Sequence, residues 1–286
     1  RIEVGSVLFA NLDHVSQAIN TADQAFAAWN LLDFAQRAAP LDKLADLLED
    51  NLAELVALCH KEAGKTIHDA IDEVREAVDF CRFYAKQEDA LAPVTVQGFD
   101  GQQRTILRDG RGVFVCISPW NFPLAIFLGQ ITAALVAGNT VVAKPAEQTS
   151  LIAVRAVELM LEAGFPCGVI QLLTGRGAQI GAALTTHSAI AGVAFTGSTQ
   201  TAQRINQSLA GRDANPVPLI AETGGQNAMI VDSTALPEQV VRDVVRSAFA
   251  SAGQRCSALR VLYVQEDIAD RIITLIHGAM EQLSIG

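Results

Sequence analysis

The sequence predicts an α/β protein in which a helical layer and a protruding β-hairpin precede a doubly wound parallel sheet. Three patterns support this fold class. Apolar residues recur every three or four positions over residues 12–88, and a polar stretch with glycines at its centre comes next. From Gly112 onward, strand-like runs alternate with helical segments of about ten to twenty residues, which is typical of βα units.

The first part of the chain has the periodicity of amphipathic helices. Ala22, Phe26 and Trp29 lie three or four residues apart, and the leucines of residues 44–55 repeat in the same way. We therefore assign residues 1–93 to a helical layer.

A hairpin is predicted over residues 94–111. The flanks of this stretch are strand-like, and Gly98 and Gly101 enclose its centre. It contains few apolar residues of its own, so it must pack against something else.

Residues 112–224 are expected to form the doubly wound sheet. In such sheets the loops at the carboxyl ends of the strands bind ligands. The predicted strands are residues 113–117, 140–143, 169–173, 191–195 and 219–221. The loops that follow them are residues 119–123, 144–149, 175–181, 196–199 and 222–227.

The beginning of a second, incomplete α/β domain is expected over residues 225–286. We predict one strand there, residues 260–264, followed by an amphipathic helix over residues 268–283.

Composition excludes several classes of protein. Half of the 286 residues are hydrophobic and 18% are charged, which excludes disorder, and no apolar run is long enough to span a membrane. A net charge of -10, without a basic stretch containing aromatic residues, excludes nucleic acid as a partner.

The cysteines indicate neither a metal site nor a disulfide framework. Their number is five, and none forms a CxxC pair. Reduced thiols fit a cytoplasmic protein. No signal peptide is visible, and the chain begins with Arg1 rather than Met, so we expect it to be a segment of a longer protein.

Five motifs, in this order, resemble the aldehyde dehydrogenase superfamily from about residue 5 to the end. They are Pro119-Trp120-Asn121-Phe122-Pro123, Lys144-Pro145-Ala146-Glu147-Gln148-Thr149, Phe195-Thr196-Gly197-Ser198-Thr199, Glu222-Thr223-Gly224-Gly225-Gln226-Asn227 and Gly253-Gln254-Arg255-Cys256. Each alone could arise by chance. The resemblance implies a Rossmann-like NAD-binding domain and a catalytic cysteine.

The resemblance assigns catalytic roles to three residues. Cys256 would attack the aldehyde carbon and become a thioester, and Asn121 would donate to the oxyanion. Glu222 would activate the hydrolytic water and is expected to be partly buried with a raised pKa. Simpler readings remain open: Asn121 could cap a helix beginning at Pro123, and Glu222 could be a surface residue of a glycine-rich turn.

The cofactor implied is NAD. Lys144 and Glu147 match residues that hold the adenosine ribose, and a carboxylate at Glu147 disfavours the 2′-phosphate of NADP. Ser198 matches a residue that meets the pyrophosphate at a helix N-terminus, and Gly197 would permit close approach. The same resemblance assigns Trp120 and Thr196 to the cofactor site. Residues 175–181 are spaced G-x-G-x-x-x-G, which alone is weak evidence for a nucleotide site.

Residues 116–127, 221–232 and 251–260 resemble one branch in particular, the dehydrogenase part of bacterial proline utilization A. That branch oxidises L-glutamate γ-semialdehyde, which equilibrates with pyrroline-5-carboxylate, to glutamate. Arg255 and Ser257 match residues that receive the substrate carboxylate, although a solvated arginine and an ordinary serine are alternatives. Another semialdehyde dehydrogenase, such as one acting on succinate semialdehyde, and a non-catalytic nucleotide-binding fragment also stay open.

The resemblance also implies partners and missing parts. Members of the branch are homo-oligomers, and an FAD-dependent proline dehydrogenase precedes the part that this chain resembles. Homologous chains continue beyond Gly286 with the rest of the catalytic domain. We therefore expect the 286 residues alone to be inactive.

Overall fold

The structure is a computed structural model that describes residues 3–284. The chain divides into two compact units, Arg1–Glu222 and Thr223–Gly286, and each is described by itself. The division falls at residue 222, close to the predicted limit at residue 224.

Unit 1 begins with the predicted helices. They are α1 (Leu12–Asn30), α2 (Phe34–Asp50), α3 (Leu52–Ala63), α4 (Ile67–Tyr84) and the short α5 (Glu88–Leu91). Local capping determines where they start, because Asn11 and Asp33 each form a capping box and the Thr66 side chain accepts from the Asp69 N–H. α3 ends at Gly64, whose φ of 68° is left-handed, and α4 starts shortly after this sharp corner.

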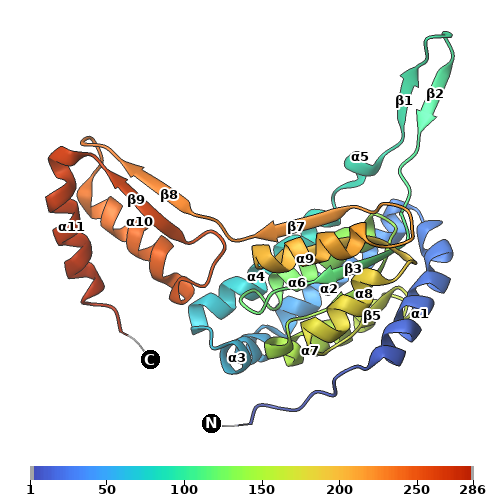
Figure 1. Cartoon of the computed structure of the whole chain (residues 1–286), viewed down its shortest axis with the longest axis horizontal. Helices are drawn as coiled ribbons and strands as arrows, with labels where there is room; N and C mark the ends of the chain where they lie inside the picture. Colours follow the sequence, from blue (N-terminus) through green and yellow to red (C-terminus); the bar gives the residue numbers. More distant parts are fainter. Residues whose placement is uncertain (1–2, 285–286) are drawn as a thin grey trace. The chain divides into compact units, whose positions relative to one another are not determined.

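The predicted hairpin is present and protrudes from unit 1 (Figure 1). Strands β1 (Val94–Gln97) and β2 (Gln103–Ile106) are antiparallel, and all of their residues are exposed. Phe99, in the turn between them, is fully exposed.

The central sheet confirms the predicted fold class. Its strands are β3 (Val113–Ile117), β4 (Thr140–Lys144), β5 (Ile170–Leu172), β6 (Ile190–Gly197) and β7 (Leu219–Thr223), in the order β5-β4-β3-β6-β7. Strand β3 pairs in parallel with both β4 and β6. From β3 the chain adds β4 and β5 on one side and then β6 and β7 on the other, so the order reverses between β3 and β6.

Helices cover both faces of this sheet (Figure 1). The connecting elements are α6 (Ala125–Val136), η1 (Glu147–Thr149), α7 (Ser150–Ala163), η2 (Gly177–Gly181), α8 (Ala182–Thr186) and α9 (Thr199–Ala210). Successive strand residues enter different cores: Phe114 and Cys116 pack with α2, α4, α6 and α7, and Val113 and Val115 pack with α1, α8 and α9. The predicted helical layer is confirmed, with α1 on the opposite face from α2 and α4.

Trp29, at the end of α1, is fixed in the first of these cores. It is 3% exposed, its Nε1 donates to the Leu135 carbonyl at 2.9 Å, and its ring lies 6.1 Å from that of Phe165.

Unit 2 is a smaller α/β layer. Its elements are β8 (Asn227–Val231), α10 (Pro237–Phe249), η3 (Ala250–Gly253), β9 (Leu259–Val264) and α11 (Glu266–Met280). The prediction of a single strand was wrong, because β8 pairs in parallel with β9. Its apolar run is only residues 228–231. Because Ile230 is apolar although it is 83% exposed, the strand shows no alternation of polar and apolar residues that would separate it from the loop.

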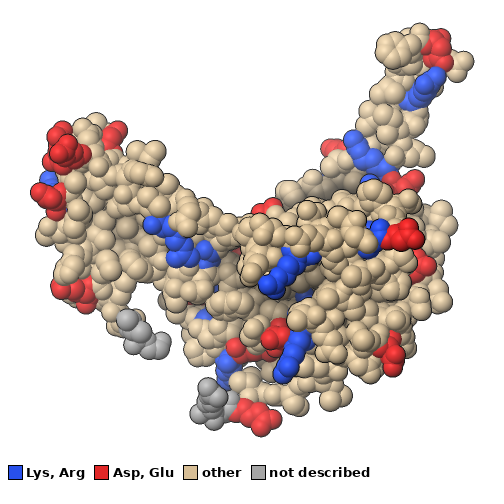
Figure 2. Space-filling view, viewed as in Figure 1, with Lys and Arg blue, Asp and Glu red and all other residues tan. Residues whose placement is uncertain are grey.

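No helix among residues 3–284 is long and apolar enough to cross a membrane. On the face that Figure 2 shows, lysine and arginine side chains are dispersed rather than gathered into one basic patch.

Gly192 tests the close packing of β6 against β3. A Cβ at Gly192 would lie 2.2 Å from the Phe114 ring, so Gly192→Ala should destabilise unit 1 by about 1–3 kcal/mol through overpacking. The matched control is Gly181→Ala, where a Cβ would meet nothing within 4 Å. Chemical denaturation followed by circular dichroism measures both. Equal stability of the two variants would contradict this packing.

Candidate functional site

The carboxyl ends of β3 and β6 border the point where the strand order reverses, which is the usual ligand crevice of such sheets. The loop of residues 119–123 leaves β3, and Trp120 in it is 42% exposed while Asn121 is half-buried. Across the reversal, Thr196 at the end of β6 accepts a hydrogen bond from Gln130 Nε2 at 2.9 Å. Helix α6 therefore connects the two sides of the crevice.

Lys144, the last residue of β4, is only 4% exposed. Burial lowers its pKa, and the nearby Glu147 carboxylate acts in the opposite direction. Within residues 3–284 its ammonium makes no hydrogen bond or ion pair, and a Cβ at Gly177 would lie 3.8 Å from Nζ. A buried cation in this state needs an acceptor, and hydroxyl oxygens of a bound sugar would supply one.

Ser198 is the N-cap of α9, as the predicted anion site requires. Its Oγ accepts from the Thr201 N–H at 3.2 Å and donates to Thr201 Oγ1 at 2.9 Å. The Ser198 hydroxyl is thus already used within the helix, and backbone N–H groups of the exposed first turn are the donors for an anion. A Cβ at Gly197 would lie 2.6 Å from the Phe195 ring, so the glycine is required by packing within β6. These donors fit a dinucleotide.

The N-terminus of α6 corrects the capping alternative for Asn121. The helix begins at Ala125 rather than Pro123, and no side chain of its own caps it. Instead Oε1 of Glu73, a buried residue of α4, accepts from the N–H groups of Leu124 and Ala125 at 2.9 Å each. Asn121 is therefore not the cap of this helix.

Glu222 lies near the end of β7, and its side chain is exposed. The prediction that this side chain is partly buried was therefore wrong. β7 is the edge strand of the sheet, and the neighbouring Ile220 is also 56% exposed.

Cys256 belongs to unit 2 and lies in a turn before β9, not on a helix. It is exposed, Ser257 is exposed and Arg255 is half-buried. The side chain of Asn227 holds this turn, because its Nδ2 donates to the carbonyls of Cys256 and Ala258 at 2.7 and 3.0 Å.

The segment just before Cys256 has an unusual backbone. Ser251, Ala252 and Gly253 have φ values of 55°, 52° and 68°, and two of them carry side chains, for which this region is costly. Arg260 Nη2 stabilises the segment by donating to the Gly253 carbonyl at 2.7 Å.

The predicted site residues thus form two groups. Arg255, Cys256 and Ser257 are adjacent in unit 2. The others lie at the carboxyl edge of the unit 1 sheet: Trp120, Asn121, Lys144, Glu147, Thr196, Gly197, Ser198 and Glu222.

Sequence reasoning missed Glu73, Gln130 and Asn227, which hold the site loops. Two of them are polar positions on helices, where periodicity gives no signal. No group of three or more metal-ligating side chains that could bind an ion occurs within residues 3–284.

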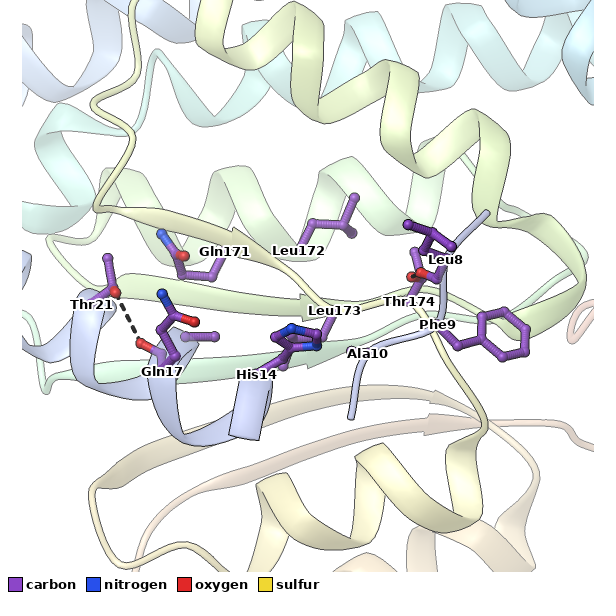
Figure 3. A pocket seen from close by; sticks show the side chains of 11 residues that line it. Leu8, Phe9, Ala10, His14, Gln17, Thr21, Gln171, Leu172, Leu173 and Thr174 are labelled. Carbon is purple, nitrogen blue, oxygen red and sulfur yellow. Dashed lines mark hydrogen bonds between the residues drawn. The ribbon is translucent and has the colours of Figure 1, made fainter. Parts of the chain in front are cut away.

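A hollow of about 360 Å³ lies elsewhere in unit 1, between α1, β5 and the segment before α1 (Figure 3). Ala10 donates to the Thr174 carbonyl at 2.8 Å, and Thr174 Oγ1 donates to the Leu8 carbonyl at 2.7 Å. None of the predicted site residues lines it.

Known proteins resemble this chain over its whole length. A model of the aldehyde dehydrogenase family matches residues 2–286. Bifunctional protein PutA of Klebsiella aerogenes is 52% identical over 99% of this chain and 21% of its own length. The 1-pyrroline-5-carboxylate dehydrogenase of Anoxybacillus flavithermus is 38% identical over 99% of this chain and 56% of its own. A crystal structure of Bradyrhizobium japonicum proline utilization A matches with a TM-score of 0.94 and 56% identity, over 98% of this chain and 29% of that one.

This chain therefore spans about a fifth of the length of the PutA relative and just over half of the dehydrogenase relative.

Burial separates the five cysteines into two sets. Burial raises the pKa of Cys59 and Cys81 to about 12 and also raises that of Cys116, whereas Cys167 and Cys256 are exposed. Because the thiolate is the reactive form, we expect two thiols to react with a disulfide reagent in the native protein at pH 8 and all five after denaturation. Cys167→Ser should lower the native count to one. A third fast thiol in the native protein would contradict this burial.

Proposed function

Since this chain belongs to the aldehyde dehydrogenase family, we propose that it carries the nucleophile, the oxyanion donor and the base of an enzyme that oxidises an aldehyde to a carboxylic acid. The observation that supports this most directly is the gathering of Asn121, the Ser198-capped helix and the Lys144 ammonium, which has no hydrogen-bond or ion-pair partner within residues 3–284, at one edge of the sheet. Such an edge suits a dinucleotide and a polarised carbonyl.

The proposed chemistry has two stages. The Cys256 thiolate attacks the aldehyde carbon, and the oxyanion accepts hydrogen bonds from the Asn121 amide and the Cys256 backbone N–H. A nicotinamide cofactor, which Lys144, Glu147 and the start of α9 would hold, would supply the acceptor for the hydride that leaves this carbon. Glu222 then takes a proton from a water molecule, whose oxygen attacks the thioester carbon and releases the acid and the thiolate. The balance is one aldehyde, one water and one oxidised cofactor converted to one carboxylate, one reduced cofactor and two protons.

The proposed substrate is L-glutamate γ-semialdehyde. The relatives named 1-pyrroline-5-carboxylate dehydrogenase and PutA support it. Arg255 and Ser257, on either side of the nucleophile, are assigned to the substrate carboxylate, for which a guanidinium and a hydroxyl are suitable donors.

The proposed cofactor is NAD rather than NADP. Lys144 and Glu147 would hold the adenosine ribose, and N–H groups at the start of α9 would meet the pyrophosphate. Trp120, on the loop that follows β3, and Thr196, at the end of β6, would border the cofactor.

We assign the whole protein to the cytoplasm, as a homo-oligomer fused to an FAD-dependent proline dehydrogenase. The five free cysteines and the exposed apolar residues of the hairpin are consistent with this assignment.

Substitutions of Cys256 and Glu222 are expected to block different stages of the reaction. In the protein that contains this chain, Cys256→Ala should abolish aldehyde oxidation, because no thioester can form. Glu222→Gln should retain one burst of reduced cofactor and then turn over slowly, because the thioester is formed but not hydrolysed. Stopped-flow absorbance at saturating aldehyde distinguishes the two. Normal steady-state turnover of Glu222→Gln would rule out the base assignment, and a better rate with succinate semialdehyde would replace the proposed substrate.

Glu147 should determine the cofactor preference. Removing its charge in Glu147→Gln should lower the ratio of NAD to NADP affinity about tenfold, which corresponds to about 1.4 kcal/mol. Calorimetric titration of the 286-residue chain measures this without any turnover. The control is Gln148→Ala, at the neighbouring exposed position. An unchanged ratio in Glu147→Gln would remove Glu147 from the ribose site.

A further inference from the structure

Helices α3 and α4 each carry one carboxylate that contacts the start of another helix. Glu62, near the end of α3, accepts from the N–H groups of Leu151 and Ile152 at 2.7 and 3.0 Å. Glu73, on α4, accepts in the same way from the N–H groups of Leu124 and Ala125, at the start of α6. Two consecutive helices of the helical layer, α3 and α4, therefore cap two different helices of the sheet, α7 and α6.

Each capped helix directly follows a loop that carries proposed site residues. Leu124 comes three positions after Asn121. α7 begins immediately after η1, whose first residue is Glu147, and Lys144 ends the preceding strand. A cap that fixes the first turn of a helix also fixes the chain that enters it, so each carboxylate determines where one site loop ends.

The contact at Glu73 extends to the loop itself. The Lys65 ammonium lies 3.0 Å from Glu73 Oε2, outside hydrogen-bond geometry, so the contact is an ion pair between two buried side chains. The same ammonium lies 4.8 Å from the centre of the Phe122 ring. Phe122 is the neighbour of Asn121, and Lys65 and Glu73 thus hold both the ring beside Asn121 and the helix start after it.

Simple fold stabilisation does not require this arrangement. The Ser198 cap of α9 shows that a local side chain can begin a helix of the same sheet. At α6 and α7 the caps come instead from residues 50 to 90 positions away in the sequence, and they bring buried or half-buried charge to the edge of the site. Burying a charge is costly unless it is paired, so these contacts impose a defined geometry on both loops.

We propose that Glu73 is a positioning residue for Asn121 and that Glu62 is a positioning residue for the Lys144–Glu147 loop, so that α4 and α3 position the oxyanion donor and the ribose site separately. The proposal rests on the function proposed above. It predicts that Glu73 affects the rate of aldehyde oxidation and that Glu62 affects the binding of NAD.

The test compares Glu73→Gln and Glu62→Gln in the protein that contains this chain. Glu73→Gln should slow the burst of reduced cofactor at saturating cofactor by about ten- to a hundredfold, since a misplacement of about 1 Å can cost that much, while the NAD dissociation constant changes less than about twofold. Glu62→Gln should raise the NAD dissociation constant about tenfold, with a smaller effect on the saturated burst. The control is Glu158→Gln, an exposed carboxylate of α7 paired with Arg155, which should change neither.

A variant that removes the buried charge altogether separates positioning from stability. Replacing an ion pair by apolar side chains is often neutral for stability, so Lys65→Met combined with Glu73→Leu should recover most of the thermal stability lost in Glu73→Gln. Because leucine offers the N–H groups of Leu124 and Ala125 no acceptor, the burst should remain slow. Recovery of the burst together with the stability would overturn the positioning role.

Amide hydrogen exchange reads the same effect without any reaction. Glu73→Gln should speed exchange at Leu124 and Ala125 but not at Leu151 and Ile152, and Glu62→Gln should do the reverse. If the parent protein oxidised no aldehyde, the proposed function would be wrong. The exchange pattern and the NAD affinities would still show whether each carboxylate holds its own loop. If both variants changed only the unfolding temperature, the proposal would be overturned.

Discussion

The starts of the helices that follow the sheet strands set the main constraint on this molecule. A helix cannot satisfy its own first N–H groups, and in a parallel sheet these starts gather at the edge where ligands bind. The chain solves this differently at three positions. Glu73 and Glu62 reach the starts of α6 and α7 from the helical layer, and Ser198 caps α9 locally. Carboxylates disfavour a further anion, so among these three the start of α9 is the one suited to a phosphate.

The sequence predicts those elements whose residues follow a local pattern, such as an apolar run or a turn motif. The hairpin follows from its turn residues, and β3 and β4 follow from apolar runs that are buried on both faces of the sheet. β8 could not be separated from its loop, since its outward residues are apolar and exposed, as at Ile230. Nor does helical periodicity say which face of a sheet a helix covers, and α1 and α2 cover opposite faces.

The site residues came from a resemblance carried by five motifs, and their surroundings required the structure. Glu222 was expected to be partly buried, but the edge position of β7 leaves it exposed. Asn121 seemed able to cap a helix, and a carboxylate from 51 residues away in sequence takes that role. Contacts over such separations leave no periodic signal. The left-handed segment before Cys256 was equally hidden, because Ser251 and Ala252 are not residue types that favour that conformation.

The two tryptophans report on only one of the two units by their fluorescence. Both belong to unit 1: Trp29 is enclosed in the core, and Trp120 is 42% exposed on the loop beside Asn121. Indole emission will therefore report the unfolding of unit 1 through Trp29 and solvent quenching through Trp120. Unit 2, which holds Cys256, has no indole of its own, so its loss of structure would go unseen in a fluorescence melt. Tyr263, on β9, is the residue there whose absorbance could follow it.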